Sequence, residues 1–243
     1  MISRLIRSLL TITALLLPLA AVAQEDANVA RMVVWQTKPG MARDFEEGYK
    51  RHLDWHRKNN DTWTWRGWTI VSGEHFGYFV DGTFFHTWKE LDTPVSPAAD
   101  SADNGVNVMP YAEIRSAAFY EAVPALTNLS SQQLAAPLLT FGYFDIQPGR
   151  AAEFESLMKD AVASVSDHTS RYALLRPVDG VTAYLLLLPA GNQQELGVQS
   201  ALLQSLLRSV TQHAKQESIV TRYRTETASY RSELSNAPEE KLK

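Results

Sequence analysis

The sequence predicts an α+β protein built from two tandem copies of one βαββαβ unit, the split-βαβ or ferredoxin-like arrangement. Two observations predict this fold. The segment TKPGMARDFEE at residues 37–47 returns as IQPGRAAEFES at residues 146–156, with Pro-Gly, Phe and Glu in the same order. Each copy is then followed by the same series of strand and helix patterns. Self-similarity at a fixed distance indicates a duplicated structural unit.

The first elements of each copy are a strand and a helix. Residues 29–36 and 138–145 are rich in Val, Leu and aromatic side chains and stop at Pro-Gly, which predicts a strand followed by a turn. The next stretch carries apolar groups at helical spacing, most clearly in the second copy, at Phe154, Leu157, Met158, Ala161, Val162 and Val165. A helix is therefore expected after each first strand.

Two strands joined by a Gly-containing turn are expected next. They are residues 65–72 with 75–81 in the first copy and residues 171–177 with 181–188 in the second. In the second copy, QQELGVQSALLQSLLRSVTQHAKQ is then an amphipathic helix and SIVTRYRTETASYRS a long final strand.

The first copy differs where the second has this last helix. Residues 91–111 contain Pro94, Pro97, Gly105 and Pro110, so no continuous helix is expected there. Long irregular segments in compact domains are often lids or binding loops. A binding loop and a degenerated exposed edge are both open interpretations of this segment.

These patterns divide the chain into five parts. They are a signal peptide (1–23), a first repeat (24–125), a linker (126–136), a second repeat (137–235) and a polar C-terminal tail (236–243). The signal peptide is predicted from two arginines, an apolar run, Pro18 and the small-residue ending Ala-Val-Ala. A periplasmic or secreted location follows, and no later stretch is long enough to span a membrane.

Composition excludes several classes of protein. The chain has no cysteine, so disulfides and thiolate metal sites are excluded and any metal site must use histidine and carboxylate. The net charge is −4 and no stripe of Lys or Arg could follow a phosphate backbone, so nucleic acid is not an expected partner. Motifs for a nucleophile elbow, a phosphate loop or a dinucleotide site are also missing.

The Pro-Gly-x-x-x-x-Phe-Glu entry to each first helix resembles the dimeric α+β barrel superfamily, which includes the antibiotic-biosynthesis-monooxygenase-like and NIPSNAP-like families. The residues that carry the resemblance are Pro39, Gly40, Phe45, Glu46, Pro148, Gly149, Phe154 and Glu155. It covers nearly the whole mature chain, and it implies a tandem fusion whose two antiparallel sheets pack into one intrachain barrel. A sheet with helices on one face needs such a partner for its other face. Further oligomerisation stays open.

A stripe on the first helix of copy one marks a candidate site. Phe45, Tyr49, His52 and His56 lie at positions i, i+4, i+7 and i+11 and share one face. Their counterparts in copy two are apolar, namely Phe154, Met158, Ala161 and Val165. The two histidines are therefore expected to point inward, between helix and sheet.

Two histidines four positions apart on a helix can bind a metal ion. HLDWH lacks the glutamate of the metalloprotease motif, so peptidase chemistry is not expected. A metal site at His52 and His56 would need a third ligand, which would come from His75, His86, Asp54 or another distant group. The alternative is a purely structural pair held by backbone carbonyls or water.

Aromatic side chains gather in the same copy. Five of the six tryptophans lie between residues 35 and 68, and TWTWRGW places Trp63 and Trp65 on one face of a strand and Trp68 on the other. Large rings beside inward histidines favour a ligand pocket, although tryptophans also serve as core filling. The predicted pocket residues are Tyr49, His52, His56, Trp65, Trp68 and His75.

Three functions follow as hypotheses. The first is a barrel whose first repeat is the binding half, for a small aromatic ligand, with the second repeat as the structural half. By resemblance the protein would be monooxygenase-like or haem-binding, with a histidine as axial ligand or base. The second is a non-catalytic periplasmic module, and the third a histidine-based divalent metal site. No catalytic residue can be assigned, because no family triad matches this sequence.

Overall fold

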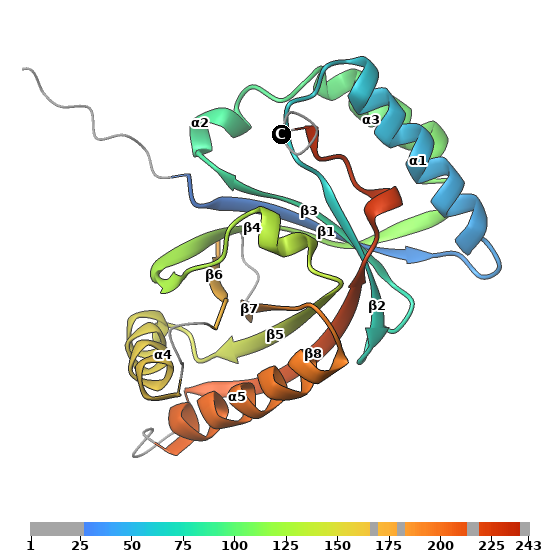
Figure 1. The fold of residues 1–243 in the computed structure, drawn as a ribbon. Helices are drawn as coiled ribbons and strands as arrows, with labels where there is room; N and C mark the ends of the chain where they lie inside the picture. Colours follow the sequence, from blue (N-terminus) through green and yellow to red (C-terminus); the bar gives the residue numbers. More distant parts are fainter. Residues whose placement is uncertain (1–26, 166–169, 179–182, 213–218, 239–243) are drawn as a thin grey trace, which may run out of the picture.

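Eight antiparallel strands close into a single barrel (Figure 1). The computed structural model describes residues 27–165, 170–178, 183–212 and 219–238. The strands are β1 (Val29–Thr37), β2 (Arg66–Ser72), β3 (Phe79–His86), β4 (Ala112–Thr127), β5 (Leu138–Ile146), β6 (Ala173–Pro177), β7 (Ala183–Ala190) and β8 (Val220–Tyr230). Their order around the barrel is β1-β3-β2-β8-β5-β7-β6-β4, and each neighbouring pair is antiparallel.

The two halves of the chain use the same strand order. The first half runs β4-β1-β3-β2 and the second β8-β5-β7-β6. Two seams join the halves: β2 pairs with β8 at Trp68 and Tyr230, and β4 pairs with β6 at Glu121 and Arg176. Because both seams are formed within one chain, every strand in the described residues has two neighbours and none is an open edge.

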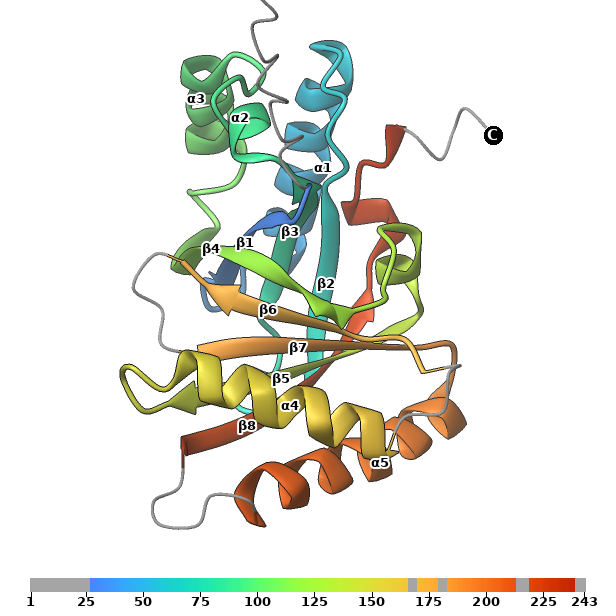
Figure 2. The ribbon, with the colours of Figure 1, turned by 90° about the vertical axis from the view of Figure 1, so that its left-hand side faces the viewer.

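Helices cover the outside of the barrel on two opposite sides. They are α1 (Ala42–Lys58), α2 (Trp88–Leu91) and α3 (Pro97–Asn107) in the first half, and α4 (Ala151–Val165) and α5 (Gln193–Gln212) in the second. Figures 1 and 2 show α1 beside α3 on one side of the barrel and α4 beside α5 on the opposite side. None of these helices is long and apolar enough to cross a membrane.

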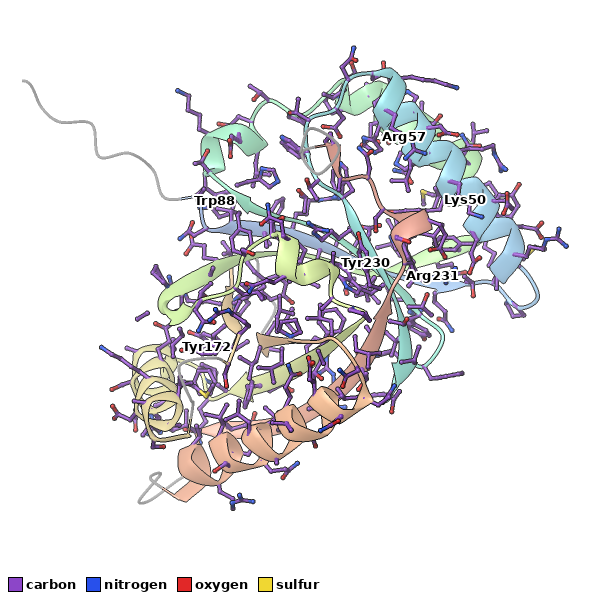
Figure 3. All side chains as sticks on the ribbon, in the orientation of Figure 1. Lys50, Arg57, Trp88, Tyr172, Tyr230 and Arg231 are labelled. Atoms are coloured by element: carbon purple, nitrogen blue, oxygen red, sulfur yellow. The ribbon has the colours of Figure 1, made fainter. Side chains whose placement is uncertain are left out.

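Charged residues mark the outer face of α1. Lys50 and Arg57 lie on this helix (Figure 3) and form ion pairs with Glu47 and Asp54. Arg231 follows β8 and bonds to both Thr69 of β2 and Glu46 of α1. The opposite face of α1 is left for packing on the sheet.

Three apolar cores hold these layers together. Side chains from all eight strands fill the barrel, among them Met32, Trp68, Val80, Tyr120, Phe141, Leu175, Leu185 and Ala228. A second core lies between the second half of the sheet and α4 with α5, and a third between the first half and α1. Trp68 is fully buried in the barrel, and its indole N–H donates to the carbonyl of Leu134 at 3.2 Å.

The segment 91–111 differs from the sequence prediction. It contains α3, so the expectation of no continuous helix there is wrong for residues 97–107. Pro97 lies at the start of α3, where its missing N–H costs no helical hydrogen bond, and Pro94 and Pro110 lie outside the helix. The prolines therefore bound this helix instead of breaking it.

The other expected strand bounds lie within two residues of the observed ones, except that the strand expected at 75–81 is observed at Phe79–His86. The linker at 126–136 includes the end of β4 and a 3-10 turn, η1 (Gln132–Ala135), whose Leu134 is buried in the barrel core. The expected signal peptide, 1–23, lies outside the described residues.

Candidate metal centre

His52 and His56 lie on the inner face of α1, one turn apart. Their residues are only 4% and 5% exposed, although imidazole is polar and α1 lies on the surface of the protein. Phe45, Tyr49 and Leu53 of the same helix pack against the sheet. The inward orientation of the two histidines, expected from the apolar residues of the other copy, is confirmed.

Each imidazole is held by a different carboxylate. Nδ1 of His52 lies 2.9 Å from Oδ1 of Asp103 in α3, and Nδ1 of His56 lies 2.8 Å from Oδ2 of Asp61. An ionised carboxylate only accepts hydrogen bonds, so each Nδ1 carries the proton. An imidazole whose single proton is on Nδ1 presents a lone pair at Nε2.

The two Nε2 atoms point at one another and at a third acceptor. The two Nε2 atoms are 3.2 Å apart. Oδ1 of Asp100 lies 3.3 Å from Nε2 of His52 and 3.5 Å from Nε2 of His56. The Asp100 oxygen is buried and has no hydrogen-bond partner among the described residues. Three lone-pair groups thus converge on one point, which is electrostatically unfavourable unless a cation or a proton lies between them.

The spacing of the three atoms matches a coordination shell. Zinc forms bonds of about 2.0–2.1 Å to nitrogen and oxygen, so two ligands of a tetrahedral ion lie about 3.3–3.4 Å apart, against about 3.0 Å for neighbours around an octahedral ion. The observed 3.2–3.5 Å is nearer the tetrahedral value. Three protein ligands would leave a fourth position open, the arrangement of catalytic rather than structural zinc sites.

Asn104 completes the surroundings of His52. Its amide nitrogen lies 2.9 Å from Nε2 of His52, while its buried carbonyl oxygen has no hydrogen-bond partner in the described part of the chain. Rotation of the amide by half a turn would direct that oxygen toward the same point. Asn104 is therefore a polar neighbour of this point, beside the three candidate ligands.

Asp61 is fixed by the aromatic segment that follows α1. It accepts hydrogen bonds from the Trp63 backbone N–H and the Trp65 indole N–H, each at 2.9 Å, in addition to His56. Burial raises the pKa of Asp61, but these three donors outweigh it and the pKa lies below its usual value. Trp65 itself is held by backbone pairing with Asn236.

A cavity of about 220 Å³ adjoins the three acceptors. Its walls combine Val33, Trp35, Leu53, Trp65, Met109 and Ile114 with polar groups from Arg31, Tyr49 and Asp81. Asp81 accepts hydrogen bonds from the Trp35 indole at 2.7 Å and the Tyr49 hydroxyl at 3.0 Å. Burial raises the pKa of Asp81, and burial together with that carboxylate raises the pKa of Tyr49 well above its usual value.

The structure brings together four of the six predicted pocket residues. Tyr49, His52, His56 and Trp65 line this cavity. Trp68 does not, because its side chain faces the barrel interior on the other side of the sheet. His75 lies in the turn between β2 and β3 at one mouth of the barrel, so these two residues belong elsewhere.

The third candidate ligand, Asp100, is a residue that sequence reasoning did not name. His75 bonds to Glu226, His86 lies against Trp63 and Thr83, and Asp54 pairs with Arg57 at the surface. Asp100 stands beside the histidines instead, on a helix that was not expected. Asp100, Asp103 and Asn104 recur at helical spacing, a signal visible only if residues 97–107 are taken as a helix.

Comparisons with known proteins show the fold. No family model matches the sequence, and a search of curated proteins found no match. A solved structure from Fusobacterium nucleatum, proposed to be a monooxygenase, is 10% identical with a TM-score of 0.59, covering 83% of this chain and 91% of that one. A chlorite dismutase variant from Candidatus Nitrospira defluvii is 10% identical with a TM-score of 0.56, covering 87% and 93%.

A heme-binding protein from Thermus thermophilus is also similar, at 11% identity and a TM-score of 0.50, covering 86% of this chain and 92% of that chain. This chain shares the α+β barrel fold of these three proteins. The prediction of an α+β barrel is confirmed. At such low identity the likeness extends to the fold and not to the residues of a site.

Proposed function

We propose that this chain is an exported α+β barrel protein that binds a divalent transition metal ion at His52, His56 and Asp100. The observation that carries the proposal is the convergence of three lone-pair atoms, all within 4.8 Å of one another, beneath a helix. Histidine with carboxylate is a donor set that suits zinc, and also iron in 2-His-1-carboxylate sites. Metal-ligating histidines usually donate their other N–H to a carboxylate, as both do here.

The adjoining cavity gives the ion a place to act. An ion with an open position acts as a Lewis acid toward an oxygen-bearing ligand. Trp35 and Trp65 supply flat apolar walls, and Arg31 and Asp81 supply polar contacts. We propose that a small ligand with an aromatic ring enters here, with its polar group directed toward His52 and His56.

Haem fits this part of the structure poorly. An axial histidine must present a free Nε2 to the iron with room for the macrocycle beyond it. Here each Nε2 faces the other histidine at 3.2 Å and Asp100 lies across them. The adjoining space of about 220 Å³ is also below the range of about 300–1,000 Å³ known for small-molecule pockets. We therefore propose a non-haem site, although a haem protein has the same fold.

Sequence and topology support two further parts of the proposal. The repeated motif and the common strand order of the halves support descent by tandem fusion of two ferredoxin-like units. The arginines, apolar run and small-residue ending of residues 1–23 support export. A monooxygenase-like activity is supported by a similar structure proposed to have that activity. A non-catalytic binding module is the alternative.

Titration calorimetry of the chelator-treated mature protein with Zn²⁺ and Co²⁺ tests the metal site. The wild type should bind one ion per chain, and Asp100→Asn should lose at least tenfold in affinity because the ion loses its only anionic ligand. Asp54→Asn is the matched control, since it removes an exposed carboxylate on α1 and should bind as the wild type does.

Replacing His52 by Ala and His56 by Val, the residues of the other copy, gives a second test. This double variant should fold, as shown by circular dichroism, and should bind no ion. Failure of the wild type to bind either ion, or equal binding by the wild type and the double variant, would contradict the proposal.

A further inference from the structure

A second cavity lies inside one mouth of the barrel, on the face of the sheet opposite the two histidines. Its volume is about 330 Å³. Apolar side chains of the barrel core form its floor, among them Met32, Ile70, Val80, Ala118 and Leu185. Mouths of β-barrels are common ligand sites, and this volume lies at the lower end of the known range of about 300–1,000 Å³. A compact ligand fits it better than an extended one.

The carboxylate in this cavity already accepts hydrogen bonds from within the protein. Glu226 of β8 is 3% exposed and accepts hydrogen bonds from the backbone N–H of His75 at 3.0 Å and from its ring Nδ1 at 2.6 Å. Gly73 permits this approach: its φ is +119°, and a Cβ there would lie 2.8 Å from Cγ of Glu226. The carboxylate therefore anchors the β2–β3 turn.

The two arginines that line this cavity form fewer polar contacts within the protein than Glu226 does. Arg224 lies two residues before Glu226 on the same strand, with its guanidinium carbon 4.0 Å from the centre of the Tyr143 ring. Its Nε atom is buried and has no hydrogen-bond partner in the described ranges of the chain. Arg115 of β4 also lines the cavity, and its ion pair with Glu113 is long, at 3.9 Å.

Charge at this mouth is therefore unbalanced. Two guanidinium groups line the cavity with one carboxylate that His75 already engages, and the Glu113 carboxylate near Arg115 is not part of the lining. Burial, and next the Glu226 carboxylate, raise the pKa of Tyr143, so its hydroxyl stays neutral and cannot balance Arg224. Guanidinium groups bind carboxylates through paired hydrogen bonds.

We infer that this barrel mouth binds a small organic carboxylate, with the carboxylate at Arg224 and Arg115 and the apolar body against the barrel core. The site is separate from the metal centre, because its lining residues point to the other face of the sheet. It needs no metal ion.

Calorimetry at low salt with benzoate and cyclohexanecarboxylate, each paired with its neutral amide, tests this inference. At least one carboxylate should bind about tenfold or more tightly than its amide, as expected for a charge-assisted pair in a partly buried site. The preference should persist in chelator and in His52→Ala, which separates this site from the metal centre.

Substitutions of arginine test whether the preference for carboxylates over amides arises in this cavity. Arg224→Gln should abolish it, while Arg222→Gln, which removes an exposed arginine of the same strand that pairs with Glu74, should preserve it. Arg115→Gln, at a half-exposed position, should weaken carboxylate binding severalfold and is the second variant if Arg224→Gln does not fold. Equal binding of acids and amides, no binding of either acid, or equal loss in Arg222→Gln and Arg224→Gln would overturn the inference.

Discussion

At the scale of single residues, two buried aspartates beside α1 respond to their surroundings in opposite directions. Asp61 accepts hydrogen bonds from His56, Trp63 and Trp65, and its pKa is lowered in spite of burial. Asp81 accepts hydrogen bonds from Trp35 and Tyr49. Burial raises its pKa by more than these hydrogen bonds lower it. The stability of the protein should therefore depend on the two carboxylates with opposite signs as pH changes.

Asp61→Asn should destabilise the protein by about 1–3 kcal/mol at neutral pH, because three donors lose a charged acceptor. Since the folded pKa of Asp61 lies below its unfolded value, its contribution is complete above the unfolded pKa and is lost as pH falls through the folded pKa. The difference between wild type and variant in urea unfolding should shrink below about pH 4. A difference that grows on acidification would contradict this assignment.

Asp81→Asn should show the reverse dependence. The folded pKa of Asp81 lies above its unfolded value, so its favourable contribution is complete below the unfolded pKa and is lost as pH rises through the folded pKa. Relative to Asp81→Asn, the wild type should be most stable near pH 4 and lose ground toward neutral pH. Urea unfolding across this range measures this difference, and a stability difference that does not change with pH would show that folding does not raise the pKa of Asp81.

At the scale of elements, the candidate metal centre depends on the contact between α1 and α3. The first helix supplies both histidines and the second supplies Asp100, Asp103 and Asn104. Gly48 of α1 lets the helices meet: a Cβ at this position would lie 1.8 Å from the carbonyl oxygen of Asn107. The backbone of α3 must move if any side chain replaces this hydrogen.

Gly48→Ala should therefore cost about 1–3 kcal/mol in unfolding free energy and weaken metal binding as well, because α3 shifts with Asp100. Gly105→Ala in α3 is the matched control. A Cβ at Gly105 has nothing within 4 Å, so this change should stabilise the protein by up to about 1 kcal/mol and leave metal affinity unchanged. Thermal unfolding and calorimetry give both quantities, and similar effects of the two alanines would refute the packing argument.

The contact between α1 and α3 also explains why the sequence predicted only the α1 residues of this candidate metal centre. His52 and His56 could be found because residues four apart on a predicted helix must be neighbours, and the apolar residues of the other copy showed which face is buried. Asp100 could not, because four prolines and glycines concealed α3. Which distant segment lies over α1 is a matter of tertiary packing that no local pattern encodes.

Strand alternation explains the remaining difference in the predicted pocket. Trp65 precedes β2 and turns toward Asp61, while Trp68 lies inside the barrel. The sequence predicted opposite faces for these two rings but could not show that one face was the interior of a closed barrel. His75 was also predicted to line this pocket, whereas the β2–β3 turn places it at the barrel mouth.

At the scale of the whole molecule, the two halves share one barrel core. Strands of both halves supply side chains to it, and Trp68 of the first half packs against Phe141 and Tyr230 of the second. A barrel closed by two seams cannot lose one half without exposing the core of the other. The described residues should therefore unfold as a single cooperative unit.

The positions of the tryptophans allow a test of this cooperative unfolding. All six tryptophans lie at or before residue 88, so their fluorescence reports on the first half, whereas far-UV circular dichroism reports on both. Urea transitions followed by the two signals should coincide in midpoint and slope. A second dichroism transition without a change in fluorescence would show that the halves unfold independently.

The most direct test of the proposed metal centre is anomalous X-ray diffraction at the zinc edge from crystals of the mature protein equilibrated with Zn²⁺. We predict one strong peak between α1 and α3, about 2.0–2.1 Å from Nε2 of His52, Nε2 of His56 and Oδ1 of Asp100. No peak at this point, with the two imidazoles joined by a hydrogen bond across 3.2 Å, would show that a proton and not a metal ion fills the site.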